Sequence, residues 1–244
     1  MTIYNRNNKN LRITNLSAIQ LFVICLVFHL LLLFPLNHSA LEAAVSSGKL
    51  VTSLPGFAVQ PLPFHLETGY IGVGGSESST YGNDSVNDHH QLFYYFVKSD
   101  RNPKEDPLVL WLTGGPRCTG LSGMAFETGP IYMSQVEYNN GSLPTLTLNP
   151  NSLTKIANMI FLDQPVNTGF SYTKSSHDSK MSDTTSAKNT YEFLIKWLIQ
   201  NPEFQSNPLY ISGDSYSGMI IPLLVQDLIR GDIILNCQAD NSCI

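Results

Sequence analysis

The sequence is poor in charged residues and has no excess of positive charge. Asp, Glu, Lys and Arg make up 14% of its 244 residues, and 14 Lys and Arg stand against 19 Asp and Glu. A chain with so few charges and 43% hydrophobic residues is not a highly charged disordered protein. The acidic balance also argues against a nucleic-acid partner, because neutralising phosphates requires a basic surface. We therefore expect a folded chain that does not bind nucleic acid.

Long apolar runs are absent as well. The longest, residues 21–36, is shorter than the about 20 residues that a membrane span requires, and Arg and Lys precede it. This pattern favours a secretory signal peptide over residues 1–43, with an uncleaved signal-anchor as the alternative. The expected contact with a membrane is through this segment alone.

Cysteine is scarce, with four residues in the chain, too few for a small fold built on disulfides. Cys118, Cys237 and Cys243 follow the signal segment, and an odd number leaves at least one thiol without a partner within the chain. N-x-S sequons at Asn83 and Asn140 lie in Gly- and Asn-rich stretches typical of surface loops. We predict glycosylation at both positions in the secretory pathway.

Short apolar runs alternate with helical patterns in the rest of the chain. The runs at 108–112, 158–162 and 209–212 are typical of strands buried on both faces of a parallel sheet. The remaining predicted elements are a hairpin of strands 69–73 and 91–97, a helix from Ser182 or Asp183 that ends at Pro202, and a helix from Ser215 to about Arg230. This order predicts an α/β sheet.

The turn between strand 209–212 and the following helix has G-x-S-x-G spacing if Gly213 and Ser217 are the small flanking residues. Small residues there let the chain turn sharply and hold Ser215 strained and exposed at a helix N-terminus. This context favours a nucleophile elbow over an ordinary turn. Ser215 is then the candidate nucleophile, and the backbone N–H of Tyr216 can face a developing oxyanion.

A second glycine-rich turn follows strand 108–112 and contains Gly114 and Gly115. Two glycines in succession expose backbone N–H groups without side chains in the way. An α/β-hydrolase places its other oxyanion donor at this point, and we assign that donor to Gly115.

These motifs carry a family resemblance. The matching segments are WLTGGP-x-C from Trp111, NPNSLTK from Asn149, IFLDQPVNTGFSY from Ile160 and GDSYSG from Gly213. Together with segments near residues 54–57, 67–74 and 91–96, they make residues 48–230 resemble the plant serine carboxypeptidase-like family. The resemblance implies a secretory protein of the vacuole or the extracellular space. It also implies an α/β-hydrolase fold with a mixed, mostly parallel sheet and flanking helices.

Two positions distinguish the branches of this family. Carboxypeptidases typically have Asn before the Gly-Gly pair and Glu before the nucleophile, where this chain has Thr113 and Asp214. The chain therefore resembles the acyltransferase branch, which moves an acyl group from a glucose ester to an alcohol acceptor through an acyl-serine. Thr113, Gly114 and Asp214 are the predicted substrate-binding residues. A carboxypeptidase acting on a peptide C-terminus is the alternative.

Two departures from the family pattern put activity of this chain in doubt. Arg117 replaces the third glycine of GGPGC, where a non-Gly residue costs on the order of 1–2 kcal/mol if φ is positive. In addition, all six His precede Ser215, whereas an α/β-hydrolase takes its acid and its base from later in the chain. A non-catalytic product is therefore a third hypothesis. The adjacent His89 and His90 do not converge easily, so we predict no metal and no cofactor.

The residues after Arg230 stop following the family pattern. We expect a partial hydrolase domain over 44–230, an aberrant tail over 231–244, and a truncated chain that lacks the later strands. In that case the strand at 209–212 becomes an apolar sheet edge, and such an edge promotes aggregation.

Overall fold

The computed structural model describes residues 48–74, 89–133, 143–174 and 181–230. The predicted signal segment 1–43, the sequons at Asn83 and Asn140, and the tail 231–244 lie outside these residues. So do Cys237 and Cys243. Within the described ranges, no helix combines the length and the apolar character needed to cross a membrane.

A mixed β-sheet forms the centre of the fold, in the order β1-β2-β3-β7-β4-β9 with β8 paired to β3. The pairs β7–β4 and β4–β9 are parallel, and the other pairs are antiparallel. The strands of this sheet are β1 (Lys49–Val51), β2 (Leu66–Val73), β3 (His90–Val97), β4 (Leu108–Leu112), β7 (Asn158–Leu162), β8 (Tyr172–Thr173) and β9 (Leu209–Gly213).

Continuous apolar sequence produces the central strands. Every residue of β7 is buried, and so is every residue of β4 except Trp111. The predicted bounds of both strands are confirmed, and the predicted hairpin is formed by β2 and β3, which pair over eight residues.

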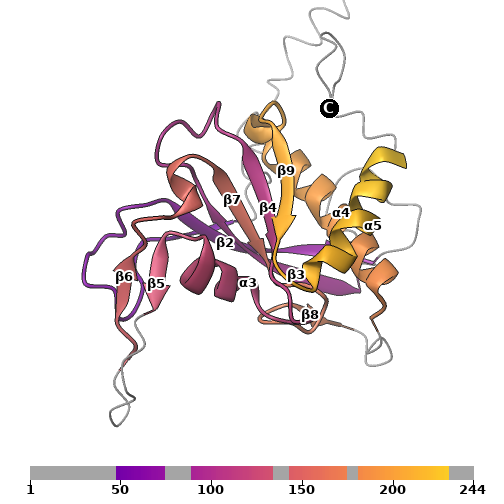
Figure 1. Cartoon of the computed structure of the whole chain (residues 1–244), viewed down its shortest axis with the longest axis horizontal. Helices are drawn as coiled ribbons and strands as arrows, with labels where there is room; N and C mark the ends of the chain where they lie inside the picture. Colours follow the sequence, from indigo (N-terminus) through magenta and orange to yellow (C-terminus); the bar gives the residue numbers. More distant parts are fainter. Residues whose placement is uncertain (1–47, 75–88, 134–142, 175–180, 231–244) are drawn as a thin grey trace, which may run out of the picture. The chain divides into compact units, whose positions relative to one another are not determined.

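Helices cover one face of this sheet, and smaller elements cover the other (Figure 1). On the first face α4 (Asp183–Gln200) and α5 (Ser217–Arg230) pack on an aromatic core that includes Phe96, Phe193 and Trp197. The other face carries α3 (Gly120–Ser122), the π-helix η1 (Gly123–Glu127), and the small sheet of β5 (Ile131–Met133) and β6 (Leu146–Leu148). Single-turn 3₁₀ helices η2 (Leu153–Lys155) and η3 (Pro202–Phe204) complete the described elements.

The two long helices begin as their sequences predict. The Ser182 hydroxyl accepts a hydrogen bond from Thr185 N and so caps α4, whose last residue, Gln200, lies just before Pro202. Helix α5 starts two residues after Ser215 and continues past an internal proline, Pro222. Both N-termini lie at the end of the sheet where the parallel strands finish.

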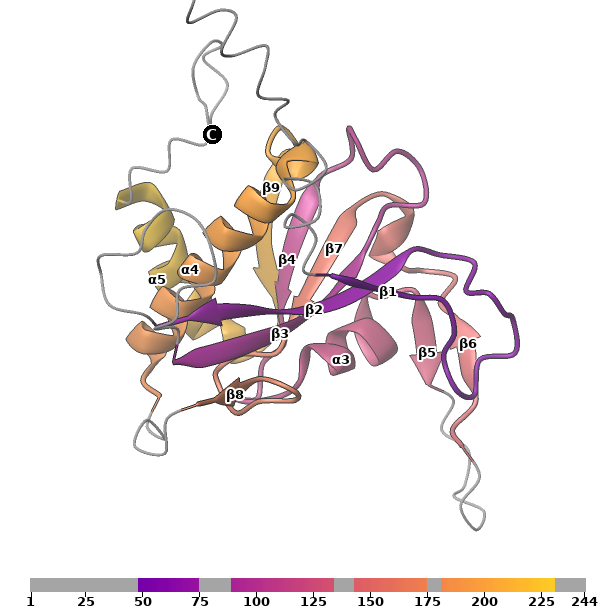
Figure 2. The ribbon, with the colours of Figure 1, turned by 180° about the vertical axis from the view of Figure 1, so that it is seen from behind.

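The last strand of the described sheet is β9, at the opposite edge from β1 (Figure 2). Each of its residues is partly or fully exposed, in contrast to β4 and β7, and Tyr210 is 57% exposed. The predicted edge position of this strand is therefore confirmed for the part of the chain that the structure describes.

Candidate active site

Three loops meet at the carboxyl ends of the parallel strands. Leu112 at the end of β4 pairs in register with Leu162 of β7 and with Gly213 of β9. The residues that follow these three positions therefore leave the sheet at the same level, as ligand sites in open α/β sheets require. This register brings the Gly-Gly turn and the Ser215 turn together.

The turn at Ser215 has the geometry of a nucleophile elbow. Ser215 has φ +49° and is exposed, so a non-Gly residue occupies the left-handed region. A Cβ on Gly213 would lie 2.2 Å from Leu112 O and 2.4 Å from Ser217 Oγ, so only glycine fits there. Ser217 is buried, and its hydroxyl donates to Asp214 O at 2.7 Å. The two small residues flanking Ser215 thus allow the sharp turn that the sequence predicts.

The Gly-Gly turn packs directly on this elbow. A Cβ on Gly114 would lie 2.8 Å from Ser215 Cβ and 2.9 Å from Tyr216 N, and Gly114 N–H donates to Asp214 Oδ1 at 2.8 Å. Gly114 N–H is thereby engaged, whereas the N–H groups of Gly115 and Tyr216 donate no hydrogen bond to any described residue. Two free backbone donors next to an exposed serine hydroxyl are suited to an oxyanion.

The Gly-Gly turn continues into a strained residue. Arg117 has φ +73° and follows a cis Gly115–Pro116 bond, and Gly115 has φ +117°. The positive φ expected at Arg117 is therefore present, at a cost on the order of 1–2 kcal/mol. The Arg117 side chain is exposed, and among the described residues it has no ion-pair partner.

Glu127 belongs to the same region, although sequence reasoning missed it. Among buried polar atoms, Glu127 Oε2, Trp111 Nε1 and Thr113 Oγ1 have no hydrogen-bond partner. Burial raises the pKa of Glu127, the charge of Asp214 raises it further, and the nearby Trp111 indole lowers it by less. The Trp111 indole and the Glu127 carboxyl thus interact without reaching hydrogen-bond geometry.

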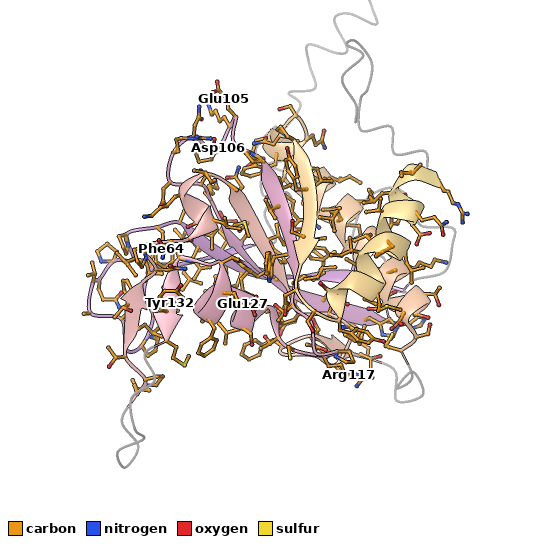
Figure 3. The ribbon with its side chains drawn as sticks, viewed as in Figure 1. Phe64, Glu105, Asp106, Arg117, Glu127 and Tyr132 are labelled. Atoms are coloured by element: carbon orange, nitrogen blue, oxygen red, sulfur yellow. The ribbon has the colours of Figure 1, made fainter. Side chains whose placement is uncertain are left out.

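Close packing next to Glu127 depends on a missing side chain. A Cβ on Gly123 would lie 2.6 Å from Trp111 Nε1 and 3.0 Å from Thr113 Oγ1, so only glycine lets η1 pack this closely on β4. The predicted substrate-binding residues Thr113 and Asp214 therefore lie with Glu127 on the side of β4 that faces η1. Glu127 is labelled in Figure 3, with Arg117 nearer the lower edge.

Asp163, the first residue after β7, stabilises the loops around the site. Its buried carboxylate accepts hydrogen bonds from Thr119 Oγ1 at 2.6 Å, Gly120 N at 2.7 Å and Phe170 N at 2.8 Å. A Cβ on Gly169 would lie 2.0 Å from this carboxylate. Burial raises the pKa of Asp163, and the three hydrogen bonds oppose the shift. Asp163 thus anchors the start of α3 to the loop that follows β7.

No described histidine acts as a partner of Ser215. His65 hydrogen-bonds Glu67, and His90 Nδ1 lies 3.1 Å from Thr173 Oγ1. Among the described residues Ser215 Oγ makes no hydrogen bond. The described residues therefore bring together the candidate nucleophile and the candidate oxyanion donors, and no described base contacts them.

Known proteins are similar to this chain in sequence. The family model of the serine carboxypeptidases matches residues 55–237. Serine carboxypeptidase-like 12 of Arabidopsis thaliana is 53% identical over 205 residues, which are 84% of this chain and 43% of that protein. Serine carboxypeptidase-like 2 of the same plant is 53% identical over 188 residues, 77% of this chain and 40% of that protein. The chain thus spans less than half the length of these relatives.

A solved structure shows the same fold. The crystal structure of Kex1(Δ)p, a prohormone-processing carboxypeptidase from Saccharomyces cerevisiae, matches 75% of this chain and 39% of its own. The TM-score is 0.56 at 24% identity, a likeness that supports the α/β-hydrolase fold predicted from the sequence. With the family match over three quarters of the residues, the chain belongs to the serine carboxypeptidase family.

Proposed function

We propose that this chain carries the nucleophile and the oxyanion donors of a serine acyl-transfer enzyme. The carrying observation is the contact of Gly114 with Ser215 and Tyr216, which sets two unbonded N–H donors beside an exposed hydroxyl. In the reaction, Ser215 Oγ forms a bond to the ester carbonyl carbon, the bond to the leaving alcohol breaks, and the seryl proton ends on that alcohol. Gly115 and Tyr216 N–H stabilise the oxyanion in between.

We favour transfer of an acyl group from a glucose ester to an alcohol acceptor. Thr113 provides a short hydroxyl where a carboxypeptidase has an amide donor, which weakens recognition of a peptide carboxylate. The partly exposed Glu127 can donate a hydrogen bond when protonated and accept one when charged, which suits hydroxyl groups. These features support a sugar or an alcohol as the substrate group near Thr113 and Glu127.

A serine-type carboxypeptidase is the second candidate, and Glu127 favours it. The raised pKa means that Glu127 keeps its proton to a higher pH than an ordinary carboxyl. A protonated carboxyl can donate a hydrogen bond to the carboxylate at a peptide C-terminus. These residues are thus compatible with either reaction, and a comparison of ester and peptide substrates separates the two.

The 244 residues contain no histidine after Ser215, and we propose that by themselves they are not catalytically competent. A serine without a general base is a weak nucleophile, and loss of one triad member removes several orders of magnitude in rate. We place the protein in the secretory pathway, bound for the vacuole or the cell exterior, with glycans on Asn83 and Asn140. Mobility shifts on deglycosylation of plant-expressed protein test the glycans.

A covalent probe tests the nucleophile. We expect a fluorophosphonate to label full-length serine carboxypeptidase-like 12 rapidly and the 244-residue chain at least about 100-fold more slowly. Ser215→Ala should abolish the residual labelling of the 244-residue chain, and Ser53→Ala, an exposed serine outside the elbow, should leave it unchanged. Labelling that survives Ser215→Ala would refute the assignment.

Substrate competition tests the reaction type. A chimera that joins residues 48–230 to the remainder of serine carboxypeptidase-like 12 should transfer acyl groups from a glucose ester to an alcohol. The same chimera should turn over blocked dipeptides more slowly. Peptidase turnover without acyl transfer would select the carboxypeptidase instead.

A further inference from the structure

A pocket lies beside the elbow, and Thr113 and Gly114 line it whereas Glu127 does not. It has a volume of about 140 Å³ and lies between the Gly-Gly turn, the loop after β7 and the first residues of α4 and α5. Its polar lining includes Arg117, Gln164, Asp183, Ser186, Tyr216 and Ser217. Pockets for drug-sized ligands hold about 300–1,000 Å³, so this one suits a molecule of only a few heavy atoms.

Two helices direct their N-termini at this pocket. Asp183 is the first residue of α4 and Ser217 the first of α5, and both line it. Each helix N-terminus carries the equivalent of roughly half a positive charge, which favours an anion. The helices have 18 and 14 residues, so both are long enough for this effect.

A buried amide adds a donor without a partner. Gln164 is 4% exposed and lines the pocket, and its Oε1 accepts a hydrogen bond from Ser186 Oγ at 2.8 Å. That bond orients the amide, and Gln164 Nε2 makes no hydrogen bond with any described residue. The amide N–H₂ group therefore remains available to a ligand oxygen.

Arg117 adds a full positive charge at the rim. Arg117 lines the pocket, and its guanidinium has no ion-pair partner among the described residues. The planar guanidinium can hold a carboxylate through two parallel hydrogen bonds.

Asp183 limits the charge of the ligand. Both oxygens of its carboxylate accept from the Tyr216 hydroxyl at 3.2 Å, so part of its hydrogen-bonding capacity is used. One carboxylate against one guanidinium and two helix termini leaves about one unit of positive charge. That balance favours a monoanion over a dianion.

We propose that this pocket binds a small monoanionic carboxylate, held by the Arg117 guanidinium and the Gln164 amide at the N-termini of α4 and α5. The carboxylate can be a free organic acid or part of a larger substrate. The proposal does not depend on acyl transfer at Ser215, because binding here requires no base.

Ligand-observed NMR with propanoate tests the proposal on the full chain, and propanamide serves as the uncharged analogue of the same shape. We expect saturation transfer to propanoate at pH 7 and at least about fivefold less to propanamide, because only propanoate matches the guanidinium. Arg117→Gly should weaken propanoate binding at least about fivefold, and glycine suits the positive φ, so this variant folds. Arg117→Lys should retain part of the affinity.

Matched variants distinguish binding in this pocket from a general effect of the net charge of the protein. Lys104→Gly also removes one exposed cation, next to Glu105 and Asp106 at the upper edge of Figure 3, and should leave binding unchanged. Asp183→Asn should strengthen propanoate binding about threefold and let inorganic phosphate compete. Three outcomes would each overturn the proposal. They are equal binding of propanoate and propanamide, an equal loss of propanoate affinity in Lys104→Gly and Arg117→Gly, and tighter binding of phosphate than of propanoate by the unmodified chain. The labelling of Ser215 is scored separately, so the two proposals fail independently.

Discussion

At the scale of single residues, missing side chains shape the site as much as present ones. Gly114 and Gly213 let two turns meet at Ser215, and Gly123 lets η1 pack directly on Trp111. Arg117 breaks this rule, because a long side chain occupies a position with positive φ. Its strain is therefore a measurable property of this chain.

Replacing Arg117 by glycine should not destabilise the protein. Relief of about 1–2 kcal/mol of backbone strain exceeds the 0.4–1 kcal/mol or so that glycine costs through the unfolded chain. We expect the free energy of unfolding in urea to rise by up to about 1 kcal/mol. Arg117→Val, with a β-branched side chain at the same φ, should lower it. A glycine variant less stable than the valine variant would contradict the strain argument.

Glu127 should make stability depend on pH. A carboxyl whose folded pKa is raised contributes stability below its unfolded pKa, near 4.3, and this contribution is lost as pH rises through the folded pKa. Glu127→Gln removes the charge, so its Tm should exceed that of the unmodified chain at pH 7, on the order of 2 °C, and match it near pH 4. Glu105→Gln, an exposed control, should show no such difference. A Tm gap that is the same at both pH values would exclude this explanation.

Glu127 is a residue of the candidate site that the sequence did not predict. The sharp turn at Ser215 was predictable because a strand, a turn and a helix occur in a fixed order around it, and the roles of Ser215, Gly115 and Tyr216 stay predictions. Glu127 follows no such motif, and its relation to Asp214 arises only when η1 folds over β4. An interaction between residues so far apart in the sequence leaves no local pattern from which it could be predicted.

At the scale of elements, length decided what could be predicted. Strands β4 and β7 have five consecutive apolar or buried residues each, and both were predictable to the residue. The elements β1, β5, β6 and β8 have only two or three residues and no measurable period. Their positions come from tertiary packing, as in the small sheet that closes the second core.

A polar network secures the other end of the central strands. Asn158 at the start of β7 and Asn207 just before β9 both donate through Nδ2 to Asp106 O, at 3.1 and 2.6 Å. The Asp106 carboxylate accepts from Ser99 Oγ at 2.6 Å and from the Arg101 guanidinium. The loop before β4 thereby aligns the starts of its two neighbours.

Asp106 should support the fold above pH 4 and lose this effect in acid. Hydrogen bonds from Arg101 and then Ser99 lower its pKa to about 2. A carboxyl with a depressed pKa contributes stability above its unfolded pKa, near 3.9, and loses it as pH falls through the folded value. Asp106→Asn should therefore unfold at lower urea than the unmodified chain at pH 7, with the gap shrinking toward pH 2. A gap that persists at pH 2 would point to lost geometry instead of lost charge.

At the scale of the whole molecule, one edge of the sheet is exposed. Among the described residues β9 has only β4 as a neighbour, and Tyr210 on β9 is 57% exposed. Met219 and Ile229 on α5 are 59% and 80% exposed. An uncovered apolar edge offers unpaired backbone groups and hydrophobic side chains to other chains.

Concentrated solutions of the 244-residue chain should therefore self-associate. We expect light scattering to rise with concentration and Tyr210→Lys to reduce it severalfold, because a lysine on an edge strand opposes edge-to-edge pairing. Leu148→Lys, a similarly exposed residue on β6, should have little effect. A monomer at every concentration, or equal effects of the two lysines, would show that β9 is not the associating edge.

The common register of β4, β7 and β9 determines where this chain tolerates insertions and deletions. A slip of one residue in β9 would move Ser215 by about 3.3 Å along the strand and reverse the face of every side chain. Ser215 would then lose its contact with Gly114, and both the elbow and the adjacent pocket would be disrupted. Length variation among descendants of this sequence should thus accumulate in the loops between elements. It should avoid β4, β7 and β9, because the register of these strands sets the position of Ser215.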